Sequence, residues 1–234
     1  LKPNKTKESK VLKRGLIPLK SIAAATMIKK DVGYIKLSTF SNSTDIEFKN
    51  ALSNLIENGM QKLILDLRFN GGGYLHQAIN VADEFLEKNK LIVYTNGAHS
   101  IKRTFYATNK GLFEKGELVL LVNSGTASAS EIVSGAIQDH KRGLIIGRRT
   151  FGKGLVQQPV LLPDSSELRI TTSRYYTPSG KCIQKPYGDS IDYDNDIIER
   201  LENGELTYND TIKNKKFNEG GILPDIFSSI DTLE

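Results

Sequence analysis

Three segments rich in glycine and serine carry the residues of this chain that could do chemistry. They are DLRFNGGG (66–73), NSGTASASE (123–131) and GRRTFGKG (147–154). Each follows a short apolar run that has the length of a buried strand. In open α/β sheets, catalytic and ligand sites gather at the carboxyl ends of strands. The coincidence of three such segments predicts a functional site where they meet.

The first segment ends in Gly71, Gly72 and Gly73, directly before an expected helix. Glycine permits positive φ, so successive backbone N–H groups can point at one spot. That geometry suits a phosphate or an oxyanion. An ordinary tight turn would explain the three glycines equally well, and both interpretations stay open.

The second segment places Ser128 three residues before Glu131, at the start of an expected helix. A serine at this spacing commonly caps the helix. It could also be a nucleophile, because an oxyanion forming there would meet the free N–H groups and the positive end of the helix. The spacing alone does not exclude Ser124 or Ser130.

The third segment matches the phosphate-binding P-loop at all but its last position. Gly154 stands where that motif needs a serine or threonine to bind Mg²⁺, so nucleotide binding is a minor alternative. Lys153 lies between two glycines and leads into an expected strand. The period of two would place Lys153, Leu155 and Gln157 on one face, where Gln157 could orient the amine. A lysine exposed at the end of a loop is the plainer interpretation.

A serine nucleophile needs a general base, and histidine is the usual one. The three histidines, His76, His99 and His140, lie in expected helices or loops without a partnering motif. His140 follows Asp139 directly, and sequence neighbours on a helix do not face each other. A lysine can serve instead where burial keeps its amine neutral. The residues are compatible with a Ser–Lys pair, and they leave open a Ser–His–Asp arrangement that no motif supports.

The elements that must position these residues alternate between strand and helix. In chain order we expect a hairpin-like strand region at 27–40, a helix from Ser43 or Thr44 to Gly59, a strand at 62–67, a helix at 75–85, strands at 91–95 and 118–124, a helix at 127–138 and a strand at 144–147. This order predicts βαβ units in a mostly parallel sheet. The last third is richer in strands, and we expect it to pack as an antiparallel extension.

Length and composition fit one large α/β domain, or one domain with a small appendage. The chain has 234 residues, of which 25% are charged and 38% hydrophobic. It has no apolar run long enough for a transmembrane helix, and its single cysteine, Cys182, excludes an intramolecular disulfide.

Residues 1–20 hold seven Lys or Arg against one Glu. Without interleaved aromatic residues or a nucleic-acid motif, this basic segment is interpreted as a linker, and we expect no nucleic-acid partner.

Six segments, in chain order, resemble the C-terminal processing (tail-specific) peptidases, which are serine peptidases with a Ser–Lys pair. They are VGYIKLSTF, LILDLRFNGGGYL, VNSGTASASEIVSGAIQD, GRRTFGKGLVQ, RYYTPSGKCIQ and GGILPD. The likeness runs from about Val32 to Asp225. It implies an α/β fold with a ClpP/crotonase-like core of βα units, extended by the antiparallel strands near the C-terminus.

The resemblance also implies a role for particular residues. It selects Ser128 as nucleophile, Lys153 as general base and Gln157 as the residue that orients the lysine. The oxyanion hole would consist of the backbone N–H of Ala129 and one from the Gly72–Gly73 pair. No metal ion or organic cofactor is implied.

Asp139 occupies a further family position that could be considered catalytic. It lies 11 residues after Ser128 (139 − 128), which is roughly 16 Å along a helix. A carboxylate at that distance cannot hydrogen-bond to the serine. We therefore expect Asp139 to be structural.

The resemblance further implies protein substrates that are cut near unstructured C-terminal ends, in the bacterial periplasm or cell envelope. The family commonly carries a PDZ module before the core, which captures C-termini by strand addition. Residues 1–20 would then be a linker or the remnant of that module, and residues 21–234 the peptidase core. The tail segment KNKKFNEGGILPD (213–225) is shorter than the family pattern leads us to expect. The chain could also form an oligomer. The alternative to a peptidase is a catalytically silent peptide-binding or scaffold domain.

Overall fold

The structure, a computed structural model, describes residues 19–186 and 220–229 continuously, together with residues 11, 13, 15, 198, 200 and 202. The strands are β1 (Ile22–Lys29), β2 (Val32–Leu37), β3 (Lys62–Asp66), β4 (Leu91–Gly97), β5 (Ser100–Tyr106), β6 (Glu117–Val122), β7 (Leu144–Gly147), β8 (Leu155–Leu161), β9 (Glu167–Tyr176) and β10 (Ile226–Phe227). The helices are α1 (Thr44–Glu57), α2 (Leu75–Asp83) and α3 (Ala129–Asp139). Among the described helices, none is long and apolar enough to cross a membrane.

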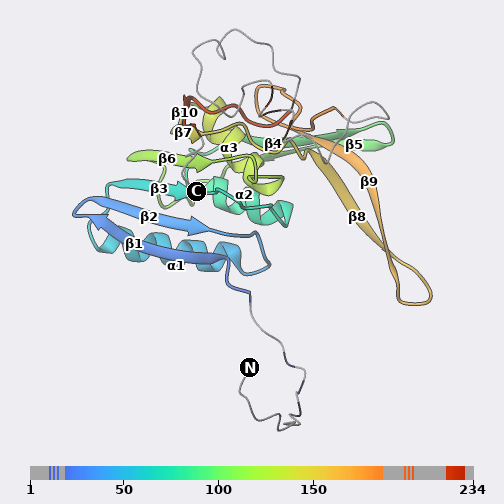
Figure 1. The fold of residues 1–234 in the computed structure, drawn as a ribbon, viewed down its shortest axis with the longest axis horizontal. Coiled ribbons are helices and arrows are strands. Elements are labelled where there is room, and N and C mark those ends of the chain that lie inside the picture. Colours follow the sequence, from blue (N-terminus) through green and yellow to red (C-terminus); the bar gives the residue numbers. More distant parts are fainter. Residues whose placement is uncertain are drawn as a thin grey trace, which may run out of the picture.

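The larger sheet has the strand order β1-β2-β3-β6-β7-β10 (Figure 1). β1 pairs antiparallel with β2, and the pairs from β2 to β10 are parallel. Leu65 in the central strand β3 is paired with Ile35 on one side and Leu120 on the other, and all three side chains are fully buried. Strands covered on both faces need such nearly continuous apolar runs. The predicted alternation of strand and helix around a parallel sheet is confirmed.

The second sheet has the order β5-β4-β9-β8 and is antiparallel throughout. The predicted antiparallel extension is therefore confirmed for β8 and β9. The strand expected at 91–95 exists as β4, but it belongs to this sheet and not to the parallel one. β5 lies in a polar stretch, near residues 96–117, for which no strand was predicted. Four successive residues of this seven-residue strand are exposed. The strand therefore lacks the alternation of buried and exposed residues by which a strand is identified from sequence.

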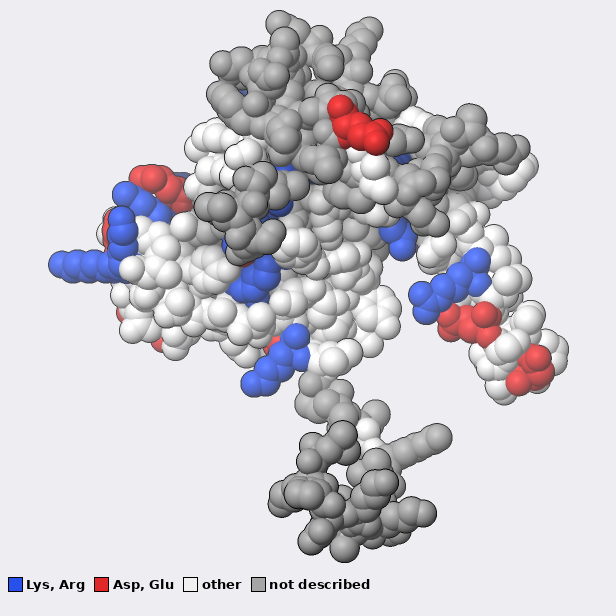
Figure 2. Space-filling model, viewed as in Figure 1, with Lys and Arg blue, Asp and Glu red and all other residues white. Residues whose placement is uncertain are grey.

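β8 and β9 form a long hairpin that projects from the body of the molecule (Figure 1). The arm carries charged side chains of both signs on the face shown in Figure 2. Its base is different, because Val156 packs against the main core and Tyr175 belongs to it. The base of the arm thereby joins the small sheet to the domain that holds the predicted site.

Two predictions concern segments that lie largely outside the described residues. The basic segment 1–20 is described only at residues 11, 13, 15, 19 and 20. Of the tail segment 213–225, residues 220–225 are described. They lead into β10, which extends the larger sheet by pairing with β7 through Ile226–Ile146 and Phe227–Gly147.

Candidate active site

The three predicted segments lie side by side, because each follows one of three adjacent parallel strands. The strands β3, β6 and β7 are neighbours in the larger sheet, so their carboxyl ends share one edge. Hydrogen bonds join the three loops directly. Ala127 N–H donates to the Asn70 carbonyl over 2.9 Å, and Phe151 N–H donates to the Thr126 carbonyl over 2.9 Å.

Ser128 is held in a strained backbone conformation at the N-terminus of α3. Its φ is 56° and its ψ is −114°, in a region that residues other than glycine seldom adopt. Strain of this kind costs about 1–3 kcal/mol and persists at functional sites, where the surrounding structure enforces it. The side chain is only half-buried. The conformation thus presents the Ser128 hydroxyl beside the start of a helix.

The two rival serines are less suited to be nucleophiles. Ser130 is fully buried, and its hydroxyl donates to the Asn70 carbonyl over 3.0 Å. Ser124 lies in the turn before α3 and so does not stand at the helix N-terminus. Ser128 is the serine of this segment that combines accessibility with that position.

A buried carboxylate, that of Glu131, fastens the Ser128 loop to the Lys153 loop. Its Oε2 accepts hydrogen bonds from Ser128 N–H at 2.7 Å and from Lys153 N–H at 2.9 Å. Because one oxygen atom binds both groups, these two backbone nitrogens lie within two hydrogen-bond lengths of each other. Its Oε1 accepts from the Thr150 hydroxyl at 2.5 Å and from Gly152 N–H at 2.7 Å.

Burial raises the pKa of Glu131, while the four hydrogen bonds from Thr150, Lys153, Gly152 and Ser128 act against that rise. All four groups donate, so each oxygen of the carboxylate is used as an acceptor. In the sequence, Glu131 stands out only by its spacing from Ser128. Its contacts 19 to 22 residues further along the chain could not be read from that spacing.

Gly72 lies against the backbone of the loop that carries Ser128. Its φ is +95°, and a Cβ there would be 2.7 Å from the Ala127 carbonyl oxygen and 2.8 Å from the Ala129 nitrogen. Only glycine permits this approach. Gly72 N–H donates to Asn70 Oδ1 over 2.9 Å, so this predicted oxyanion donor is already occupied. Gly73 N–H and Ala129 N–H have no hydrogen-bond acceptor within the described part of the chain.

Lys153 is half-buried, and the glycines on both sides of it are packed closely. A Cβ on Gly154 would be 2.4 Å from the Gln184 nitrogen. Gln157 lies in β8 opposite Thr171 and is exposed. Among the described hydrogen bonds, none joins Gln157 to Lys153. The predicted orienting role of Gln157 therefore stays a prediction.

The loop that carries Lys153 is also held from the far part of the chain by Arg200, which is 1% exposed. Its guanidinium donates to three consecutive carbonyls, those of Arg149 at 3.2 Å, Thr150 at 3.1 Å and Phe151 at 3.3 Å. Sequence reasoning missed this residue. Nothing in the local pattern around position 200 indicates partners so far back in the chain.

Asp66 and Arg68 stiffen the entry to the Gly72 loop and were not singled out from the sequence. Arg68 donates to the buried Asp66 carboxylate through Nε at 3.0 Å and Nη2 at 2.7 Å, and Tyr34 donates over 2.8 Å. Burial alone would raise the pKa of Asp66. The hydrogen bonds from Arg68, Tyr34 and Lys36 outweigh that effect and lower the pKa to about 2.

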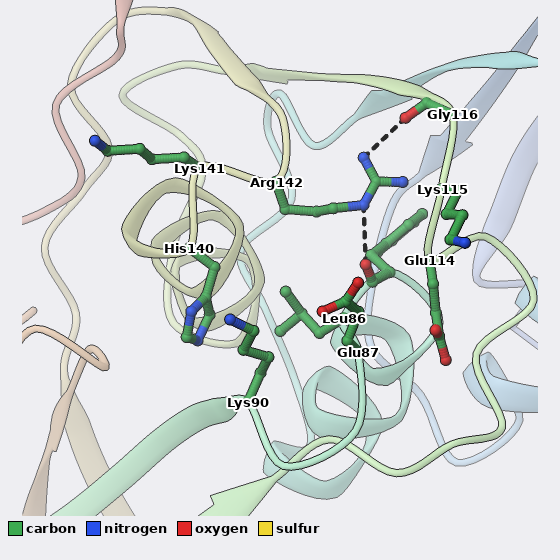
Figure 3. Close-up of a pocket in the computed structure, with 10 residues that line it drawn as sticks. Leu86, Glu87, Lys90, Glu114, Lys115, Gly116, His140, Lys141 and Arg142 are labelled. Carbon is green, nitrogen blue, oxygen red and sulfur yellow. Dashed lines mark hydrogen bonds between the residues drawn. The ribbon is translucent and has the colours of Figure 1, made fainter.

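His140 lies at the other end of α3 from Ser128, so the structure separates it from the predicted site. The 11-residue helix puts roughly 16 Å between its ends. The Nε2 atom of His140 lies 2.7 Å from the Leu91 carbonyl oxygen. Figure 3 shows it lining a different pocket with Lys90 and with Arg142, whose guanidinium donates to backbone carbonyls.

Asp139 accepts a hydrogen bond from Ser179 N–H at 2.8 Å. This contact fixes the turn after β9 and agrees with the structural role predicted for Asp139.

The P-loop alternative fails on geometry. Segment 147–154 leads into strand β8 and not into a helix, whose N-terminus would bind the phosphate. The N–H groups of Gly152 and Lys153 are also already bonded to Glu131.

Comparison with known proteins assigns the family. Residues 31–197, more than half of the chain, match the model of peptidase family S41. The chloroplastic C-terminal processing peptidase of Tetradesmus obliquus is 40% identical over 169 residues, covering 70% of this chain and 36% of that protein. The carboxy-terminal-processing protease of Bartonella bacilliformis is 39% identical over 175 residues, covering 73% of this chain and 40% of that protein.

The fold also matches a solved structure, the photosystem II D1 C-terminal processing protease. The TM-score is 0.62 at 34% sequence identity, covering 84% of this chain and 42% of that one. The matched regions make up about two fifths of these known proteins. The chain belongs to peptidase family S41.

Proposed function

We propose that this chain is the catalytic core of a serine endopeptidase that cuts protein substrates near their C-terminal ends through a Ser–Lys acyl-enzyme mechanism. The names of the relatives support C-terminal processing as the class of reaction. The observation that carries the proposal is the Glu131 carboxylate. One of its oxygens binds the backbone N–H groups of both Ser128 and Lys153, at 2.7 and 2.9 Å, and so keeps the two loops together.

In the proposed reaction, Ser128 Oγ attacks the carbonyl carbon of the scissile peptide while neutral Lys153 Nζ accepts its proton. The N–H groups of Ala129 and Gly73 stabilise the oxyanion of the tetrahedral intermediate. Collapse of the intermediate breaks the C–N bond, and the lysine returns the proton to the leaving amine. Water then attacks the acyl-enzyme in the same way and frees Ser128. Gln157 would orient the lysine amine during both steps.

Substitutions at the two proposed catalytic residues test this mechanism. Ser128→Ala should abolish peptide hydrolysis while leaving the chain folded. Lys153→Arg should be as inactive as Lys153→Ala, because arginine keeps the charge but does not lose its proton in proteins. Loss of a general base costs about 10²–10⁴-fold in rate. Substantial hydrolysis by Lys153→Arg, with circular dichroism unchanged, would refute the role of Lys153 as base.

Three broader features follow the family resemblance and are proposed with the function. They are the ClpP/crotonase-like type of the βα core, a PDZ module upstream of residues 21–234, and a location in the periplasm or cell envelope of a bacterium. The relatives include a chloroplastic enzyme as well as a bacterial one, so fractionation of the source cells is the direct test of location. Sedimentation of the purified chain would show whether it forms an oligomer.

A further inference from the structure

Phe69 is an exposed aromatic residue in the loop that contacts the segment of the proposed catalytic serine. It is 77% exposed, although it belongs to a loop that contacts the nucleophile segment. An aromatic side chain left in water gives up the stabilisation that burial would bring. Phe69 also has a φ of 61°, in the left-handed region that bulky residues rarely adopt. The chain thus carries two separate costs at one position.

The local turn explains the conformation but not the choice of residue. Asn70 N–H donates to the Leu67 carbonyl over 3.1 Å, which makes Phe69 the third residue of a β-turn. A positive φ at that position favours glycine or asparagine. Either would form the turn with less strain. Nothing in the folding of the turn requires a phenylalanine.

Hydrogen bonds fix the backbone around Phe69, and the ring packs on one side against the neighbouring loop. Phe69 N–H donates to Oδ1 of the buried Asn123 over 2.9 Å, and the same oxygen accepts from Gly125 N–H over 3.1 Å. The ring lies over Gly125, where a Cβ would be 3.0 Å from Phe69 Cδ1. Because Gly125 has no side chain, the ring has room to lie there.

Phe69 is also close enough to Ser128 for one bound substrate to contact both residues. Phe69 is three residues before Gly72, which touches Ser128, so the Cα atoms of Phe69 and Gly72 are at most about 11 Å apart. An extended peptide advances about 3.3 Å per residue. A substrate whose carbonyl sits at Ser128 can therefore place a side chain two or three residues away against this ring.

We propose that Phe69 is a specificity-determining residue that contacts an apolar side chain of the substrate, two or three residues from the scissile bond. The proposal rests on the proposed peptidase function. It adds that the substrates are extended segments with an apolar residue at that distance. Phe69 is not part of the catalytic chemistry, so substrates without such a residue should be cut equally well with or without the ring.

The test uses two unstructured fluorogenic peptides of equal length and charge, one with Leu and Phe through its central segment and one with Ser in their place. The ratio of their kcat/KM values is measured for the wild-type chain, Phe69→Asn and the control Ile101→Asn. Ile101 is 86% exposed in β5, outside the three loops. Asparagine accepts a positive φ, so the Tm of Phe69→Asn should not fall.

The proposal predicts that Phe69→Asn lowers the preference for the apolar peptide about 3- to 10-fold, as expected for one aromatic contact. The kcat/KM for the serine peptide and the ratio for Ile101→Asn should stay within twofold of wild type. An unchanged ratio in Phe69→Asn, or an equal fall for both peptides, would overturn it. The Kd of the apolar peptide for Ser128→Ala, with and without Phe69→Asn, gives the same decision without turnover. Should the peptidase proposal fail, this arm still decides the role of Phe69.

Discussion

Replacing Glu131 with glutamine should disturb the proposed active site, because this carboxylate accepts four hydrogen bonds from the two loops that form it. The carboxylate has only donors around it, and glutamine puts an NH₂ group in place of one oxygen. If the NH₂ replaces Oε2, the N–H groups of Ser128 and Lys153 both lose their acceptor. If it replaces Oε1, the Thr150 hydroxyl can turn to accept, but Gly152 N–H is left unpaired.

Each buried donor left without a partner costs about 1–3 kcal/mol. With at least one such donor, Glu131→Gln should lose about 1–3 kcal/mol of unfolding free energy. Because Glu131 sets the distance between the Ser128 and Lys153 loops, kcat should also fall. A displacement of about 1 Å between catalytic groups can cost on the order of 10²-fold in rate.

The assays are urea denaturation and peptide hydrolysis, with Glu47→Gln as the matched control. Glu47 also accepts from two backbone N–H groups, those of Ser21 and Ile22, but it belongs to α1 and is only half-buried. Its substitution should leave kcat unchanged. Wild-type stability and wild-type kcat in Glu131→Gln would refute the role assigned to this carboxylate.

Three further predictions concern the same region. Gly72→Ala should abolish hydrolysis and lower stability, because its Cβ would meet the Ala127 carbonyl at 2.7 Å, whereas Gly71→Ala, with nothing within 4 Å, should retain activity. Asp66→Asn should lose about 2 kcal/mol at pH 7, because the folded pKa of about 2 lies below the ordinary value of 3.8. That stabilisation is present above about pH 4 and is lost as the pH falls toward 2, so urea melts of Asp66→Asn and wild type should converge there. His140→Gln should leave the pH–rate profile unchanged, and loss of activity would reinstate histidine as the base.

The sequence predicted the parts of the fold whose signal is local. The apolar runs of β3, β6 and β7 identify buried strands, and the glycine- and serine-rich loops after them mark one edge of the sheet. The partners of these loops depend on distant segments and could not be predicted. Arg200 reaches back to the carbonyls of the loop between β7 and β8, and β4 pairs with β9 across the whole of the intervening α/β segment.

The same distinction applies within the site. The spacing of Ser128 and Glu131 predicted a helix start, which α3 confirms. The spacing could not show that the carboxylate also binds the Lys153 loop, because that contact depends on the pairing of β6 with β7. The run of three glycines indicated positive φ angles, which Gly72 and Gly73 adopt. It could not show that Asn70 occupies the Gly72 N–H.

Covalent labelling with a fluorophosphonate, followed by peptide mapping, tests the assignment of Ser128 and Lys153 most directly. Such probes react with an activated serine hydroxyl, so they report the nucleophile itself. We expect one adduct, on Ser128 Oγ, which is absent in Ser128→Ala and strongly reduced in Lys153→Ala. A label on Ser124 or Ser130, or peptide hydrolysis that persists in Ser128→Ala, would contradict it.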